Sequence, residues 1–75
     1  MPNVPIVTAR KIITVIKKKG FVYKRSKGSH QIYIRFSDQK SVSIPIHSGK
    51  DLGRGITRSI LKDADISLEE FLKLI

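Results

Sequence analysis

The stretch "QIYIRFSDQKSVSIPIH", residues 31–47, decides the fold, because it holds two alternating segments joined by a short polar turn. Alternation of apolar and polar residues is typical of strands with one buried face. We expect the apolar positions to share the core face, with Ile32, Ile34 and Phe36 opposite Ile46, Ile44 and Val42. The outer face of the first strand would then carry Gln31, Tyr33 and Arg35. Pro45 lacks an N–H, which predicts an edge or broken position in the second strand.

The segments on either side of this hairpin supply the remaining elements. Residues 8–20, "TARKIITVIKKKG", predict a helix with Thr8 as N-cap and Gly20 in the left-handed position after its end. Residues 21–27 predict a first strand that turns at Gly28. Residues 56–64 predict a second helix with a stripe of Ile56, Ile60 and Leu61, and Ser67 with Glu70 forms a capping box for a short third helix.

The order of these elements is helix, three strands, helix and a short extra helix. Three antiparallel strands with one apolar face need a cover, and the helices are the only cover this chain offers. The sequence therefore predicts an α+β fold of the double-stranded-RNA-binding type, with helices on one face of a three-stranded antiparallel sheet. We expect residues 1–75 to form a single domain.

The charge is strongly basic and unevenly distributed. Fifteen Lys and Arg face six Asp and Glu, and no acid precedes Asp38, whereas nine of the basic residues do. A clustered basic excess indicates a polyanion binder, and a solvated basic face is the plainer alternative. Cysteine is absent, so neither a disulfide framework nor a thiolate zinc site is expected, and we expect no cofactor. No apolar run could span a membrane and no signal peptide is evident, which favours a cytoplasmic location.

The two histidines are the candidate catalytic residues. The expected register puts His30 beside Ser48 and His47 beside Gln31, at one end of the hairpin but on opposite faces. Several cations lie nearby in sequence: Lys27, Lys50, Arg54 and Arg58. The start of the second helix offers free N–H groups to phosphate. Histidine titrates near ~6.5, so an imidazole here could serve RNA cleavage, in which the 2′-hydroxyl needs a base.

Plainer interpretations of the same residues remain open. A histidine at a strand start is most often a partly exposed side chain with one hydrogen bond, and His47 after Pro45 can simply fix the loop. Tyr33 and Arg35 on the outer face could stack RNA bases or form ordinary cross-strand pairs. The stretch "SGKD" is no phosphate-binding P-loop, since Ile44 stands where its first glycine belongs.

Three stretches together resemble the HicA toxins of bacterial and archaeal toxin–antitoxin systems. They are "GFVYKRSKGSHQIYI" (20–34), "VSIPIHSGKDLGRG" (42–55) and "RSILKDADISLEEFLKL" (58–74). The resemblance implies a double-stranded-RNA-binding-like fold, an RNA-cleaving translation inhibitor and neutralisation by a HicB antitoxin. It implies one essential histidine, carried onto His30 by the match at Gly28-Ser29-His30. The chain departs from the family at 53–55, where Gly-Arg-Gly replaces a frequent Pro-Gly.

The leading hypothesis is the toxin of a type II toxin–antitoxin system, a metal-independent endoribonuclease that cleaves mRNA with His30 as catalytic residue. The expected phosphate-binding residues are Lys27, Ser29, Lys50, Arg54 and Arg58, with His47 and Tyr33 in supporting roles. A non-catalytic RNA-binding domain of the same fold is the alternative. A third possibility is an interaction protein whose basic surface meets an acidic partner protein.

Overall fold

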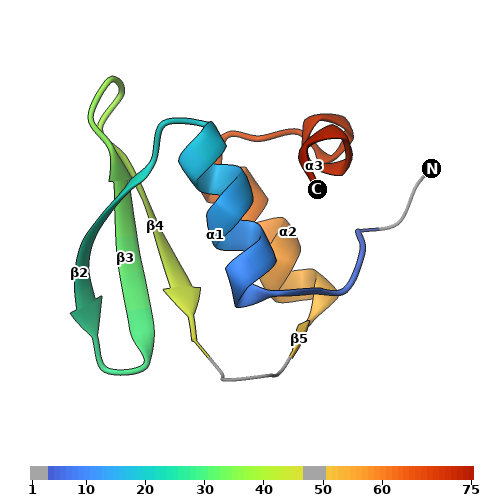
Figure 1. Ribbon diagram of the computed structural model, residues 1–75, viewed down its shortest axis with the longest axis horizontal. Coiled ribbons are helices and arrows are strands. Elements are labelled where there is room, and N and C mark those ends of the chain that lie inside the picture. The colour runs from blue at the N-terminus through green and yellow to red at the C-terminus, as the bar shows by residue number, and fades with distance from the viewer. Residues whose placement is uncertain (1–3, 47–50) are drawn as a thin grey trace.

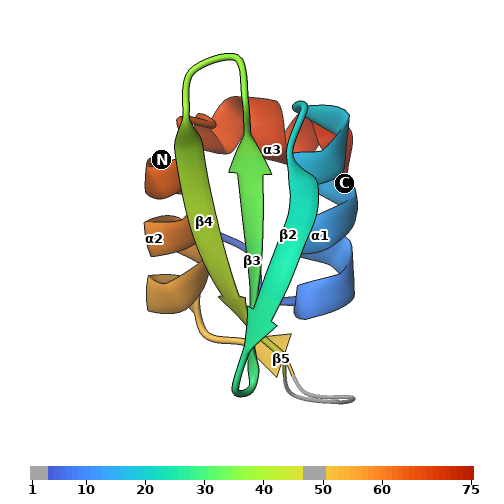
Figure 2. The ribbon, with the colours of Figure 1, turned by 90° about the vertical axis from the view of Figure 1, so that its left-hand side faces the viewer.

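The computed structural model describes residues 4–46 and 51–75. Its elements follow the order β1 (Val7–Thr8), α1 (Ala9–Lys18), β2 (Val22–Lys27), β3 (His30–Arg35), β4 (Lys40–Pro45), β5 (Asp51–Leu52), α2 (Arg54–Ala64) and α3 (Leu68–Leu74). Strands β2, β3 and β4 form an antiparallel sheet, and α1 and α2 cover one of its faces (Figures 1 and 2). The predicted fold class is confirmed. No helix in the described part of the chain is long and apolar enough to cross a membrane.

Helix α1 begins and ends as its sequence predicts. The Thr8 side chain accepts a hydrogen bond from the Lys11 backbone N–H at 3.3 Å. After the last turn, Gly20 adopts a φ of 92°, its N–H donates to the Lys17 carbonyl, and the Phe21 N–H donates to the Ile16 carbonyl. This pair of bonds is the Schellman motif, in which a residue with positive φ ends the helix.

Helix α2 ends with the same motif but begins earlier than predicted. The Ile66 N–H donates to the Leu61 carbonyl, and Asp65 takes the left-handed position with a φ of 57°. The helix starts at Arg54, because Gly53 has the extended backbone of an N-cap. Its buried face includes Thr57, and the predicted core residue Ile56 is 46% exposed. The expected stripe was therefore wrong at its first position.

A second, two-stranded sheet joins the N-terminal segment to the region before α2, and the sequence pattern does not predict it. Strand β1 pairs antiparallel with β5, with Val7 opposite Leu52 and Thr8 opposite Asp51. Both Val7 and Leu52 are buried in the core. The pair fixes β5 against the start of α1 (Figure 1).

The register between β3 and β4 differs from the prediction by three residues. Tyr33, and not Phe36, lies opposite Val42, and Gln31 lies opposite Ile44. A shift by an odd number moves every side chain of a strand to the other face. Tyr33 accordingly lies on the face that the helices cover and is 3% exposed, whereas Phe36 is 66% exposed. The predicted core face of β3 was therefore wrong.

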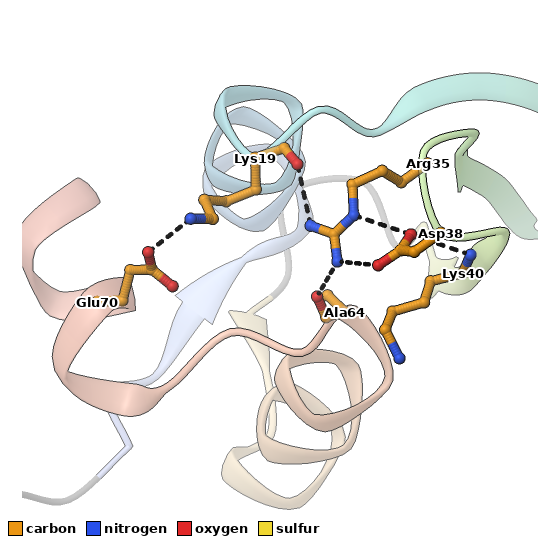
Figure 3. A network of polar contacts seen from close by, with 6 residues as sticks. All are labelled: Lys19, Arg35, Asp38, Lys40, Ala64 and Glu70. Atoms are coloured by element: carbon orange, nitrogen blue, oxygen red, sulfur yellow. Dashed lines mark hydrogen bonds and ion pairs between the residues drawn. The ribbon is translucent and has the colours of Figure 1, made fainter.

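Tyr33 and Arg35 can occupy the helix side because their polar ends are satisfied there. The Tyr33 hydroxyl donates to Gln31 Oε1 at 2.8 Å, and burial raises the pKa of this tyrosine. Arg35 donates to two helix-end carbonyls, to Lys19 O at 3.0 Å and to Ala64 O at 3.2 Å (Figure 3). Long side chains with apolar stems and polar tips are suited to such half-buried positions.

Arg35 also forms an ion pair and an aromatic contact. Its guanidinium donates to both carboxylate oxygens of Asp38, and its central carbon lies 4.6 Å from the centroid of the Phe21 ring. The hydrogen bond from Arg35 lowers the pKa of Asp38, and the same bond raises the pKa of Arg35. One side chain thus joins β3, the turn after it and the ends of α1 and α2.

Helix α3 is held against the end of α1. Its N-cap Ser67 accepts from the Glu70 N–H at 3.1 Å, which confirms the predicted cap. Glu70 forms an ion pair with Lys19, and Lys18 Nζ donates to the Leu74 carbonyl at 3.2 Å. Phe71 is fully buried in the core.

Candidate functional site

The elements that carry the predicted site meet at one end of the molecule. The turn between β2 and β3, strand β5 and the starts of α1 and α2 lie together at the bottom of Figures 1 and 2. We call this region the His30 end. The turn between β3 and β4, the ends of both helices and α3 lie at the opposite end. Because α1 and α2 both start at the His30 end, the positive ends of both helix dipoles lie there.

His30 is the first residue of β3 and lies on the sheet face that carries no helix. It is exposed and sits between Lys27 of β2 and Pro45 of β4. Neighbours directly opposite on adjacent strands share a face, and Tyr33, three residues along, faces the helices. His30 and Lys27 therefore project side by side on the helix-free face.

The backbone around His30 is fixed at two points. Gly28 makes the β2–β3 turn with a φ of 59°, a conformation that glycine adopts readily. The Ser29 carbonyl then accepts a hydrogen bond from the Ile46 N–H at 2.8 Å, which ties the turn to the end of β4. The imidazole is thus exposed on a backbone that is held in place.

Positive charge gathers around this residue without matching acids. Strand β2 carries Lys24, Arg25 and Lys27, and all six of its residues are exposed. Among the described acids, only Asp51 of β5 belongs to the His30 end. The others lie on the β3–β4 turn, the last part of α2 and its cap, and α3: Asp38, Asp63, Asp65, Glu69 and Glu70. The His30 end therefore suits a polyanion such as the phosphate backbone of a nucleic acid.

The structure brings some of the predicted residues together and separates others. Lys27 and Ser29 accompany His30, whereas Arg54 and Arg58 start the helix layer behind the sheet. Arg54 also has a bond that was not predicted, from its Nε to the Val4 carbonyl at 2.9 Å. The predicted neighbour of His30, Ser48, is replaced by Pro45. His47 and Lys50 lie outside the described residues.

Tyr33 does not reach the helix-free face, so its predicted place on the outer face was wrong. Its ring packs edge-on against Tyr23 at a centroid distance of 5.8 Å, on the helix side of the sheet. Ile32 and Ile34, which were expected on the core face, lie on the helix-free face instead. The apolar alternation favours the opposite arrangement, and the register of the hairpin overrides it.

No group of three metal-binding side chains occurs within residues 4–46 and 51–75.

A family model described as "HicA toxin of bacterial toxin-antitoxin" matches residues 9–66 of the chain. A search of curated proteins finds no match.

Proposed function

Because this chain belongs to the HicA toxin family, as a toxin with an antitoxin partner, we propose that it is an endoribonuclease with His30 as its acid–base residue. The observation that carries the proposal is an exposed His30 beside Lys27, after a turn that is hydrogen-bonded to the end of β4. The proposed substrate is mRNA, and the expected outcome in a cell is inhibition of translation.

The proposed chemistry needs only the substrate and these side chains. The imidazole of His30 takes the proton of a 2′-hydroxyl, whose oxygen then attacks the adjacent phosphorus. The bond from phosphorus to the 5′-oxygen breaks, and that oxygen takes up a proton from solvent. The products are a 2′,3′-cyclic phosphate and a 5′-hydroxyl end. The Lys27 ammonium, one strand away, is placed to offset negative charge that develops on the phosphate.

Replacement of His30 tests this assignment. Purified wild type and His30→Ala are incubated with an end-labelled mRNA fragment, with and without EDTA. Acid–base catalysis typically contributes 10²–10⁴-fold, so we expect the variant to lose at least about 100-fold in rate. His30 is exposed, so circular dichroism should show an unchanged fold. A folded variant that cleaves at the wild-type rate would refute the role of His30, and wild-type activity that needs Mg²⁺ would refute the metal-free chemistry.

A non-catalytic RNA-binding domain remains the second candidate. The exposure of all of β2, with its three cations, favours it, because phosphate binding there needs no histidine. RNA that is bound but stays intact under the same conditions selects this candidate.

We propose further that a HicB-type antitoxin inhibits the toxin by covering the His30 end. Complementary charge would guide such a partner to the basic residues there. Lys27→Glu should weaken both RNA binding and antitoxin binding, whereas Lys62→Glu, near the opposite end of α2, should weaken neither. A complex that survives Lys27→Glu unchanged while RNA binding is lost would place the antitoxin on another surface.

A further inference from the structure

The helix-free face of the sheet, turned toward the viewer in Figure 2, continues from His30 in ordered rows. Each row holds one residue from each strand. The first row is Lys27, His30 and Pro45, the second is Arg25, Ile32 and Ser43, and the third is Val22, Ile34 and Ser41. No acid stands in these rows.

The second and third rows form an apolar floor between two polar borders. Ile34 is 9% exposed although it lies outside the core cluster, and Ile32 is half-buried. Val22 is 47% exposed beside them. The border on β4 is made of the exposed hydroxyls of Ser41 and Ser43, and the border on β2 includes the Arg25 guanidinium.

The spacing of the rows relates this floor to the proposed cleavage site. Successive residues on one face of a strand lie about 7 Å apart, so the second row is one short step from His30. An RNA strand that places a phosphate at His30 and Lys27, and continues along β3, must put its next nucleotide over Ile32.

We propose that the second and third rows bind one unpaired RNA base next to the cleaved bond, and so contribute to the choice of cleavage site. The face of the base packs on Ile32 and Val22, its polar edge meets the hydroxyls of Ser43 or Ser41, and its phosphate meets Arg25. This inference rests on the proposed ribonuclease function.

The composition of the face favours RNA over a protein as its occupant. Apolar floor, hydroxyl border and guanidinium match the three parts of a nucleotide: the face of the base, its polar edge and its phosphate. The face is also continuous with His30 and free of acids, as a polyanion requires. A duplex hides the faces of its bases, so the surface fits unpaired RNA only.

The test compares single-stranded and duplex RNA of one sequence, measured by fluorescence anisotropy at fixed salt. All proteins carry His30→Ala, which prevents cleavage during the measurement. The double variant Val22→Thr with Ile32→Thr keeps β-branched side chains but places hydroxyls on the floor. The control is Ile75→Thr, since Ile75 is 43% exposed and lies after α3 at the opposite end.

We expect the double variant to bind single-stranded RNA about tenfold more weakly, because hydroxyls replace part of the apolar surface that the base would cover. Duplex binding and the control should stay within twofold of the parent. Equal losses for both RNAs, or no loss for either, would overturn the proposal. Loss of antitoxin binding with unchanged RNA binding would assign the face to a protein instead.

A second measurement does not depend on the stability of the variants. RNA that contains 4-thiouridine is crosslinked to the protein with His30→Ala as its only substitution, and the modified peptides are mapped. Crosslinks within residues 22–25 or 32–43 support the proposal, and crosslinks confined to α1 or α2 overturn it. If wild type binds through this face but does not cleave, the ribonuclease proposal fails while the binding surface stands.

Discussion

At the scale of single residues, Arg35 does more for this fold than its position in an alternating strand suggests. Its guanidinium reaches the C-terminal carbonyls of α1 and α2, lies on the Phe21 ring and pairs with Asp38. Cations are favoured at helix C-termini, and here one cation serves two helices. The side chain is 15% exposed, so most of these contacts are shielded from water.

We predict that Arg35→Lys destabilises the protein by about 2–4 kcal/mol, because hydrogen bonds of charged groups contribute ~1.5–3 kcal/mol each and lysine lacks the planar fork. Urea unfolding of the two proteins measures the difference. Arg58→Lys, at an exposed position of α2, is the matched control and should change stability by less than ~0.5 kcal/mol. A loss below 1 kcal/mol for Arg35→Lys would contradict the importance of this contact.

The Asp38 carboxylate predicts how stability depends on acidity. Its hydrogen bonds to Arg35 lower its pKa in the folded state. Below the ordinary aspartate pKa of about 3.9, the Asp38 carboxylate is protonated in the unfolded chain but stays ionised in the folded chain until the pH reaches its lowered pKa. The contribution of Asp38 is therefore fully present above that pH and lost as pH falls through the lowered pKa.

Urea unfolding between pH 2 and 6, in wild type, Asp38→Asn and the exposed-site control Asp63→Asn, tests this prediction. We expect Asp38→Asn to show a shallower fall in stability on acidification than Asp63→Asn. Identical pH profiles for the two variants would show that the ion pair does not contribute.

At the scale of elements, α1 and α2 both end in Schellman motifs, and a carbonyl at the end of each helix accepts a hydrogen bond from Arg35. The end of α1, at Gly20, is the more tightly packed against Arg35. A Cβ added at Gly20 would lie 3.3 Å from Arg35 Cδ, and its φ of 92° disfavours any other residue. We predict that Gly20→Ala lowers stability by about 1–2 kcal/mol. Thermal unfolding checks this, with Gly55→Ala as control, since Gly55 has no atom within 4 Å of an added Cβ. A more stable Gly20→Ala protein would contradict it.

The elements themselves were largely predictable, whereas the register between two of them was not. Caps such as Thr8 and Ser67 act over three or four residues, so local sequence is enough to place them. Register depends on the turn. Here Gln39 adopts a positive φ of 61°, and the sequence does not indicate this because the residue is not a glycine. The Asp38 side chain also accepts a hydrogen bond from the Lys40 N–H. These contacts close the hairpin sooner than the apolar pattern favours.

At the scale of the whole molecule, the acids are concentrated toward one end, whereas cations occur at both ends. The cations of β2 lie on the sheet with His30, those at the starts of α1 and α2 lie in the helix layer behind it at the same end, and five of the six acids lie toward the other end. The sequence predicted that Lys27 and His30 flank a turn at Gly28 in a basic segment, because these features are local, and the catalytic role of His30 stays a prediction. It could not predict which face holds the histidine, since that depends on the register that only the folded hairpin fixes.

We predict that the affinity for single-stranded RNA falls steeply with salt, and that Lys27→Gln reduces the slope of log K against log salt by about 0.7, the value for one phosphate contact. Binding titrations at four salt concentrations measure the slope. Lys62→Gln, toward the end of α2, should leave it unchanged. Equal slopes for wild type and Lys27→Gln would remove Lys27 from the RNA interface.

The way α1 is held also bears on how the protein can be removed. Its start adjoins the β1–β5 pair, and its end is bonded to α3, some fifty residues away along the chain. Opening of α1 breaks contacts on both sides and exposes its fully buried Ile12, Val15 and Ile16, so its backbone amides should exchange with solvent mainly through global unfolding. A protease then gains access at the rate set by that rare event. A chain built this way is poorly suited to control by rapid turnover, and its activity is more readily governed by a partner that binds and leaves.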